Sequence, residues 1–339
     1  MSGDPIRVNL ALQGGGAHGA FTWGVLDRLL EEPDIVIDGV SGTSAGAMNA
    51  AVLADGMARG GNQGARERLA QFWDTVIHMG RFGPLVRTPL DAMAVPWNME
   101  YSPGYMIFDA ISRYFSPYQF NPMNWNPLLA MLRETIDFDR VRACDCIKLF
   151  VAATAVRTGK LRVFHTREMT PEAVMASACL PHVFQAVEID GEPYWDGGYM
   201  GNPALFPLIY NCDASDIMIV QVNPLARDET PTTTPAILDR VNEISFNATL
   251  MREMRAIDFV SRLVAEHKLE SDGHKPVRLH RVDVPEPMRH LSAASKLNAE
   301  RSFLNQLHAW GREQADGWLA DHRRDLGARS TIDIERDTT

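Results

Sequence analysis

The sequence predicts an α/β fold in which helices pack on both faces of a mainly parallel central sheet. Short apolar strands alternate with helical segments along the chain, and this alternation is typical of strands buried between two helical layers. Glycine-rich turns at residues 14–19 and 42–46 follow the first two predicted strands and lead directly into helices. A chain of 339 residues can bury a large core as one enlarged domain, or as one domain with an appendage.

The first predicted strand covers residues 7–13 (RVNLALQ), and a helix with one apolar face follows at residues 20–32. The loop between them has the sequence GGGAHG and consists of Gly14, Gly15, Gly16, Ala17, His18 and Gly19. Backbone N–H groups in such a loop converge on one point, and the N-terminus of the following helix adds positive potential there. The loop is therefore predicted to bind an anion, either a phosphate or the oxyanion of an acyl-transfer transition state.

A second glycine motif surrounds Ser44. Residues 35–37 are a β-branched run typical of a buried strand, and residues 42–46 have the sequence GTSAG, a G-x-S-x-G. Small apolar residues after it predict a helix that packs closely on the sheet. Strand, sharp turn and helix are the context of a nucleophile elbow, in which Gly42 and Gly46 leave room for an exposed Ser44. The alternative is an ordinary glycine-rich turn with a solvent-facing serine.

A dinucleotide site is an alternative for the first loop, because residues 14–19 also satisfy G-x-G-x-x-G after a strand. Asp38 lies about twenty residues further on, where a ribose-binding carboxylate is expected. However, Asp38 leads directly into the G-x-S-x-G, and the later sequence shows no second mononucleotide-binding half. We therefore favour an acyl-transfer site.

A third motif, Asp196-Gly197-Gly198, follows a predicted hairpin formed by residues 183–189 and 193–195. The segment ASACLP at residues 176–181 precedes this hairpin. An aspartate followed by two glycines is common turn chemistry, so the motif is a weak signal when it is taken alone.

Taken in order, an early GGGxxG, a GxSxG 28 positions later, an ASxxxP and a late DGG resemble the patatin-like phospholipase family of bacterial type. The resemblance covers residues 7–210 and implies a three-layer patatin-like fold. It also implies a serine lipid acyl hydrolase with a Ser-Asp dyad, which needs no histidine, metal or cofactor. The sequence leaves open which lipid or other acyl ester is the substrate.

The resemblance assigns roles to individual residues. Ser44 would be the nucleophile, Asp196 the base, and the N–H groups of Gly14, Gly15 and Gly16 the oxyanion hole. The residues that would support these motifs are His18, Gly19, Gly42, Gly46, Gly197 and Gly198. Because an aspartate with its usual pKa of ~4 is a poor base at neutral pH, we expect the site to be partly dry.

Two positions depart from the family pattern. Gln13 stands where many members have an acidic residue, and we expect this change to matter little. His18 stands where many members have Arg or Lys, so a permanent positive charge beside the predicted oxyanion hole is missing. Any contribution from His18 is then expected to depend on pH.

A Ser-Asp-His triad of α/β-hydrolase type is the alternative mechanism, because some histidines follow Asp196 in the chain. These are His267, His274, His280, His290, His308 and His322. However, Ser44 ends only the second predicted strand, whereas the α/β-hydrolase fold places its serine after several strands. None of these histidines lies in a recognisable turn motif, so we interpret them as surface or packing residues.

The net charge of −10 argues against nucleic acid as a partner and against simple electrostatic docking to anionic lipid. Residues 1–5 are polar and no apolar run reaches membrane-spanning length, so we expect neither a signal peptide nor a membrane span. No second Cys or His pair has zinc spacing near Cys144 and Cys146. We therefore expect Cys144, Cys146, Cys179 and Cys212 to be free thiols, and the protein to lie in a reducing cytoplasm. Peripheral contact of the protein with a membrane or lipid surface is left open.

Residues 81–128 differ in composition from the rest of the chain. They contain seven of the 20 prolines, together with many aromatic and methionine residues, and only residues 105–115 are predicted to be helical. As a functional interpretation, this insertion is a cap that lines an acyl-chain pocket. The alternative is a surface excursion whose apolar residues form a small core of their own.

Further strands are predicted at residues 147–155, 161–164, 217–222 and 277–282, and further helices at residues 128–135 and 171–179. Two long helical patterns at residues 237–268 and 292–319 flank the last strand. Packing on the sheet or the cap explains the first pattern, which also leaves open a homo-oligomer, a membrane-surface contact or a non-catalytic helical scaffold.

These predictions define the expected domain organisation. Residues 7–210 would form the hydrolase domain, and residues 211–325 would complete it or be appended to it. Residues 326–339 have little apolar content and are expected to be a disordered tail.

Overall fold

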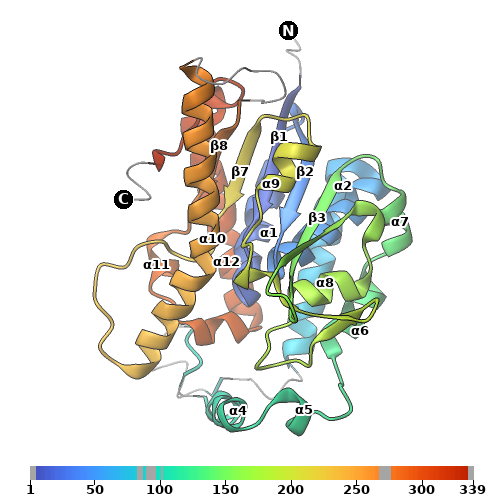
Figure 1. The fold of residues 1–339 in the computed structure, drawn as a ribbon, viewed down its shortest axis with the longest axis vertical. Helices are drawn as coiled ribbons and strands as arrows, with labels where there is room; N and C mark the ends of the chain where they lie inside the picture. Colours follow the sequence, from blue (N-terminus) through green and yellow to red (C-terminus); the bar gives the residue numbers. More distant parts are fainter. Residues whose placement is uncertain (1–4, 82–86, 89–96, 101, 267–275, 335–339) are drawn as a thin grey trace.

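The computed structural model describes residues 5–81, 87–88, 97–100, 102–266 and 276–334. In this part of the chain an eight-stranded sheet has the order β5-β6-β3-β2-β1-β7-β8, with β4 paired to β3 (Figure 1). The strands are β1 (Ile6–Leu12), β2 (Ile35–Gly42), β3 (Lys148–Ala155), β4 (Leu161–His165), β5 (Val187–Ile189), β6 (Glu192–Asp196), β7 (Asp216–Val220) and β8 (Arg278–Val282). β3, β2, β1, β7 and β8 are parallel, which confirms the mainly parallel sheet.

Alternate residues of the central strands enter two separate cores, because successive side chains of a strand point to opposite faces. On β1, Leu10 and Leu12 join the core under α1 (Gly19–Leu29), α2 (Ala45–Arg81) and α12 (Arg301–His322). Ala11 joins the other core, with side chains of α9 (Phe206–Asn211) and α10 (Thr234–Ala265). The fold therefore has three layers, with the sheet between two groups of helices.

The remaining helices are short and start at favourable residues. They are α4 (Pro103–Tyr114), α5 (Pro117–Phe120), α6 (Pro127–Thr135), α7 (Phe138–Ala143), α8 (Pro171–Ser177) and α11 (Glu286–Arg289). Proline begins α4, α5, α6 and α8, where its missing N–H costs no hydrogen bond. The side chains of Asn126 and Thr170 accept N–H groups of the first turns of α6 and α8 and cap these helices.

The chain after residue 210 completes the same sheet, because β7 pairs with β1 and β8 pairs with β7. α12 also packs closely along α1. A Cβ on Gly24 of α1 would lie 2.0 Å from the carbonyl oxygen of His308, and a Cβ on Gly311 would lie 2.1 Å from that of Phe21. Two glycines thus let the helix backbones touch, which joins both ends of the sequence in one core.

Two long helices differ from the prediction. A 3-10 helix, η4 (Ala293–Leu297), precedes α12, so the predicted helix at residues 292–319 is interrupted. The buried Asn298 explains the interruption, because its side chain accepts the N–H of Glu300 and donates to the carbonyl oxygen of Trp97. Such side-chain bonds compete with helical backbone bonds.

In the first part of α10 the buried face is not the one we predicted, whereas Met254 of the predicted apolar stripe is buried. Ile237, Val241 and Ile244 were expected to pack, but they are 44%, 56% and 54% exposed. The helix instead buries Glu243 and Asn247 on the face that also carries Phe246, Leu250 and Met254. Apolar periodicity missed the first part of this face because Glu243 and Asn247 are polar. Positions 267 and 268 of the predicted helix lie outside the described residues.

The prediction of four free cysteines was wrong, and that of a disordered tail does not hold for residues 326–334, while residues 335–339 lie outside the described part of the chain. Cys144 and Cys146 form a disulfide, so only Cys179 and Cys212 are free thiols among the described residues. The spacing of Cys144 and Cys146 suggested a metal site, but it also permits a disulfide between them. The cysteines therefore no longer support a reducing compartment. In the tail, residues 326–334 take defined positions because Leu326 and Ile334 are buried and the N–H of Thr331 bonds to Leu279.

The insertion at residues 81–128 contains α4 and α5, which confirms its one predicted helix and adds a shorter one. Residues 82–86, 89–96 and 101 of this insertion lie outside the described residues. Apolar side chains of α4 and of the segment after it are exposed, including Met106, Ile107, Tyr114, Met123 and Trp125. These side chains are not packed in a core, whereas Met99 of the same insertion is fully buried and Trp97 stacks on Phe303. No helix in the described ranges has the length and apolar character needed to cross a membrane.

Candidate active site

Ser44 stands at the sharp turn between β2 and α2. Its φ angle is 55°, in the left-handed region that non-glycine residues rarely adopt. A Cβ on Gly46 would lie 2.2 Å from the carbonyl oxygen of Leu12, so only glycine permits the helix to start this close to β1. Thr43 and Ala45 are buried, whereas Ser44 is partly exposed. The backbone thus has the form of a nucleophile elbow.

The glycine loop lies beside this serine, because Leu12 and Gly42 pair at the ends of β1 and β2. A Cβ on Gly14 would lie 2.7 Å from the Cβ of Ser44, so no larger residue fits between the loop and the serine. Gly19 packs equally tightly on Ala45. The two motifs that the sequence places 28 positions apart therefore form one surface at the carboxyl ends of the strands.

The donors of the loop differ from the prediction at Gly14. Its N–H already donates to Oδ1 of Asn202 over 2.7 Å, because the buried Asn202 side chain lies directly against the loop. The N–H groups of Gly15 and Gly16 have no hydrogen-bond acceptor within the described residues. The N–H groups of Gly15 and Gly16 are therefore unoccupied in this part of the chain, whereas that of Gly14 is occupied.

Gln13 holds the loop in place through side-chain hydrogen bonds. It is fully buried, and its Oε1 accepts the N–H groups of Val222 and Asn223 over 2.8 Å each. Its Nε2 donates to Oδ1 of Asn247 over 2.7 Å. An acidic side chain could not make this last bond, so Gln13 joins the loop to β7 and α10 in a way that an acid cannot.

Asp196 lies at the end of β6, next to β3, and is fully buried. Its Oδ1 accepts the N–H of Gly198 over 2.7 Å, while Oδ2 has no hydrogen-bond partner in the described part of the chain. Gly197 packs on the carbonyl oxygen of Ala152, and this contact fixes the turn.

Desolvation raises the pKa of Asp196 to about 7, against smaller lowering effects of the Gly198 N–H, the Ser44 hydroxyl and the charge of Lys296. The Ser44 hydroxyl thus lies close enough to act on the carboxylate, although it does not meet hydrogen-bond geometry at Oδ2. A buried carboxylate with one oxygen unengaged and a pKa near neutrality is suited to accept a proton.

His18 is buried and neutral, which corrects the expected pH dependence. Desolvation and the nearby charge of Lys296 lower the pKa of His18 to about 3. Its Nε2 lies 2.8 Å from Oγ of Ser295, which itself donates to the carbonyl oxygen of Ser292. His18 must therefore donate to Ser295, and it carries no charge near neutral pH.

The described histidines after Asp196 contact other parts of the molecule. His280 pairs with Asp216, His308 with Asp27, His290 with Glu286 and His322 with Asp325. His267 and His274 lie outside the described residues. Among the described residues, no histidine forms a hydrogen bond with Ser44 or Asp196, which argues against the triad.

Asp38, the residue that suggested a ribose contact, faces away from the loop. Its Oδ2 accepts the N–H groups of Asp213 and Ala214 at the start of β7. The carboxylate is therefore occupied at the opposite ends of the strands, and it does not support a dinucleotide site.

Sequence reasoning missed several residues that contact the motifs. Oγ of Ser177, at the end of α8, accepts the N–H of Ser44 over 2.9 Å. Asn202, Asn223 and Lys296 surround the glycine loop. The ASxxxP motif contains Ser177 but did not indicate its role, and nothing in the sequence singles out the other three.

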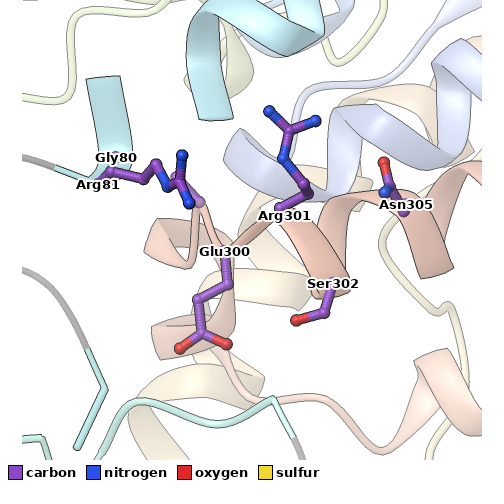
Figure 2. A pocket seen from close by; sticks show the side chains of 7 residues that line it. Gly80, Arg81, Glu300, Arg301, Ser302 and Asn305 are labelled. Atoms are coloured by element: carbon purple, nitrogen blue, oxygen red, sulfur yellow. The ribbon is translucent and has the colours of Figure 1, made fainter. Parts of the chain in front are cut away.

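An open pocket of about 650 Å³ lies between the C-terminal end of α2 and the N-terminal end of α12 (Figure 2). It is lined by Gly80, Arg81, Ala299, Glu300, Arg301, Ser302 and Asn305. None of these residues belongs to the glycine motifs or to the D-G-G turn, so the pocket is separate from the candidate site.

Sequence and structure comparisons relate this chain to known proteins. The sequence model of the patatin-like phospholipase family matches residues 10–209. A comparison with curated protein sequences found no match. Among solved structures, the chain is similar to VipD from Legionella pneumophila, with 16% identity and a TM-score of 0.36, over 92% of this chain and 67% of VipD.

Two further structures are similar at the same low level. The type III effector protein ExoU has 16% identity and a TM-score of 0.34, over 94% of this chain and 53% of ExoU. ExoU in complex with SpcU, from the type III secretion system of Pseudomonas aeruginosa, has 15% identity and a TM-score of 0.31, over 92% of this chain and 53% of ExoU. The chain thus spans about half the length of the ExoU chains that it matches.

Proposed function

Because this chain belongs to the patatin-like phospholipase family, a family of lipid acyl hydrolases, we propose that it hydrolyses lipid esters with Ser44 as nucleophile and Asp196 as base. The observation that carries the proposal is the state of Asp196. Its buried carboxyl has one unengaged oxygen, and burial raises its pKa to about 7, so it can take a proton near neutral pH. No charged partner is needed for this role.

The reaction proceeds in two halves. Ser44 Oγ attacks the ester carbonyl carbon while its proton passes to Asp196 Oδ2, and the N–H groups of Gly15 and Gly16 stabilise the oxyanion. Asp196 then returns the proton to the alcohol that leaves, and an acyl-enzyme remains. Water attacks this ester, its proton passes to Asp196 and then to Ser44 Oγ, and the fatty acid is released.

A fluorophosphonate probe tests this proposal, because it reacts only with an activated serine. The wild type should be labelled on Ser44, Ser44→Ala should not be labelled, and Asp196→Asn should react much more slowly with an unchanged circular dichroism spectrum. His280→Ala and His308→Ala should be labelled at the wild-type rate. A wild type that resists labelling would favour the non-catalytic scaffold, and a slow histidine variant would favour a triad.

We further propose that the enzyme works at a lipid surface, as a peripheral protein. Apolar side chains are exposed on α4 and at the start of α10, including Ile107 at 61% and Val241 at 56%. The pKa of Tyr105 on α4 is raised in part by Asp239 on α10, so the two helices lie near each other. A second copy of the chain is the other candidate for covering this apolar surface, and the vesicle experiment in the Discussion separates the two.

A further inference from the structure

The glycine loop touches a lysine from a distant part of the sequence, Lys296 in η4. A Cβ on Gly16 would lie 2.5 Å from the carbonyl oxygen of Lys296, so the two backbones are in contact. The Lys296 side chain extends from there to Asn223, three residues past the end of β7 at Val220. Its Nζ donates to Oδ1 of Asn223 over 2.7 Å. A cationic group therefore lies beside the loop, although the loop itself contains none.

Asn223 links this cation to the loop. Its side chain is buried, and its Nδ2 donates to the carbonyl oxygen of Gly14 over 2.8 Å. This carbonyl and the N–H of Gly15 belong to one planar peptide group, so a bond to the oxygen fixes the direction of the N–H. Hydrogen bonds in series polarise one another. The Lys296 ammonium bonded to Oδ1 of Asn223 therefore strengthens the Gly15 N–H as a hydrogen-bond donor.

Burial lowers the pKa of Lys296 below its usual value, although three nearby carboxylates oppose this shift. Desolvation and Arg227 lower the pKa of Lys296, whereas Glu243 and Asp239 of α10 and Asp196 raise it. Glu243 is also paired with Arg227 and Arg240. The neighbouring His18 is neutral and cannot contribute a positive charge.

We propose that Lys296 is a positioning residue for acyl transfer, which orients and polarises the Gly14–Gly15 peptide through Asn223 and supplies the positive charge that His18 does not. The role assumes the proposed reaction at Ser44. Lys296 does not touch the ester in this role. Its charge also favours the ionised form of Asp196, and so it acts on both the oxyanion loop and the base.

The test is the rate of fluorophosphonate labelling as a function of pH for two substitutions. Lys296→Gln keeps a hydrogen-bond donor for Asn223 but removes the charge, so labelling at neutral pH should slow about tenfold or more. The rising limb of its pH profile should also move to higher pH, because Asp196 loses a favourable charge. Lys296→Arg keeps the charge and should retain both the rate and the midpoint of this limb. Lys148→Gln, which removes a lysine that pairs with Asp38, is the control and should match the wild type.

Labelling of the wild type separates a failure of the Lys296 proposal from a failure of the proposed reaction at Ser44. A wild type without labelling would contradict the proposed function, whereas a labelled wild type with an unaffected Lys296→Gln variant would make Lys296 a packing residue only. Equal slowing by Gln and Arg, with an unmoved midpoint, would likewise overturn the role of its charge.

If Lys296→Gln does not fold, the wild type and Lys296→Arg provide a second test. The wild-type rate should fall on the alkaline side as Lys296 loses its proton, and in Lys296→Arg this fall should move to higher pH. An alkaline limb that stays in place in the Arg variant would overturn the proposal.

Discussion

The backbone N–H of Ser44 donates a hydrogen bond to Oγ of Ser177, 2.9 Å away, across 133 positions of sequence. Ser44 has a left-handed φ angle of 55°, and such a conformation persists only when surrounding contacts hold it. Ser177 is fully buried and lies at the end of α8, so its hydroxyl is itself well fixed. The ASxxxP motif therefore supports the turn of the GxSxG motif directly.

Replacing Ser177 with Ala should slow fluorophosphonate labelling about tenfold with only a modest loss of stability. The variant leaves the Ser44 N–H without its partner, which costs about 1–3 kcal/mol and loosens the turn. Ser41→Ala is a matched control, because the Ser41 hydroxyl makes a similar buried bond to the carbonyl oxygen of Ala204 but does not contact Ser44. Equal rates in the two variants would show that Ser177 has no special role at the turn.

Gly14→Ala should abolish labelling. The added Cβ would lie 2.7 Å from the Cβ of Ser44 and 2.9 Å from the carbonyl oxygen of Thr43, so the loop must move away from the serine. Gly317→Ala is the control, because its Cβ would meet nothing within 4 Å and alanine favours a helix by about 1 kcal/mol. The control should label normally and melt at a slightly higher temperature. Retained labelling in Gly14→Ala would contradict the close packing of loop and serine.

The rate of labelling should rise with pH and reach half of its maximum near pH 7. Burial raises the pKa of Asp196 to about 7, and only the ionised carboxylate can accept the Ser44 proton. The rate is therefore low below this pKa and levels off above it. Because the measurement follows a single phosphonylation of the serine, slow product release cannot distort the profile. A midpoint near pH 4 would mean that Asp196 is as hydrated as a surface carboxylate.

Asp196→Asn should stabilise the protein at pH 8 more than at pH 4. The folded-state pKa of Asp196 lies above the unfolded value of 3.8, so the folded wild type binds more protons between these values and loses stability as pH rises. The loss is on the order of 4 kcal/mol or less by pH 7, and the amide cannot ionise. Thermal melting of both proteins at the two pH values measures the difference. An equal effect at pH 4 and pH 8 would indicate that burial does not penalise the Asp196 charge.

Ile107→Asp should weaken binding to neutral phosphatidylcholine vesicles about tenfold or more, because an apolar side chain of this size gains about 1.5–3 kcal/mol when it leaves water. High salt should change wild-type binding little, since the net charge of −10 does not favour electrostatic docking. Tyr210→Asp is the control, because Tyr210 is 81% exposed on α9, away from α4. Unchanged vesicle binding by Ile107→Asp, or a wild-type dimer that this change dissociates, would favour a second copy as the partner.

Sequence reasoning located the parts of the site that depend on local structure. Ser44 could be predicted because a strand, two glycines and a helix of small residues within one short segment specify a sharp turn. Several buried strands were predicted to within two residues for the same reason, since an apolar run such as residues 147–155 depends little on its surroundings. β2, however, extends five residues beyond the predicted run at residues 35–37. Asp196 required the order of four motifs, because a single D-G-G occurs in many ordinary turns.

The sequence by itself thus determined the layered fold, the serine turn and the residues of the proposed dyad. Only the tertiary structure decided which donors the glycine loop keeps free, and where its positive charge comes from. Asn202 occupies the Gly14 N–H and Lys296 reaches the loop through Asn223, although these residues are 188 and about 280 positions away from it. Burial likewise keeps His18 neutral and raises the pKa of Asp196 to about 7. Such properties depend on solvation and on distant partners, and local sequence patterns carry no information about either.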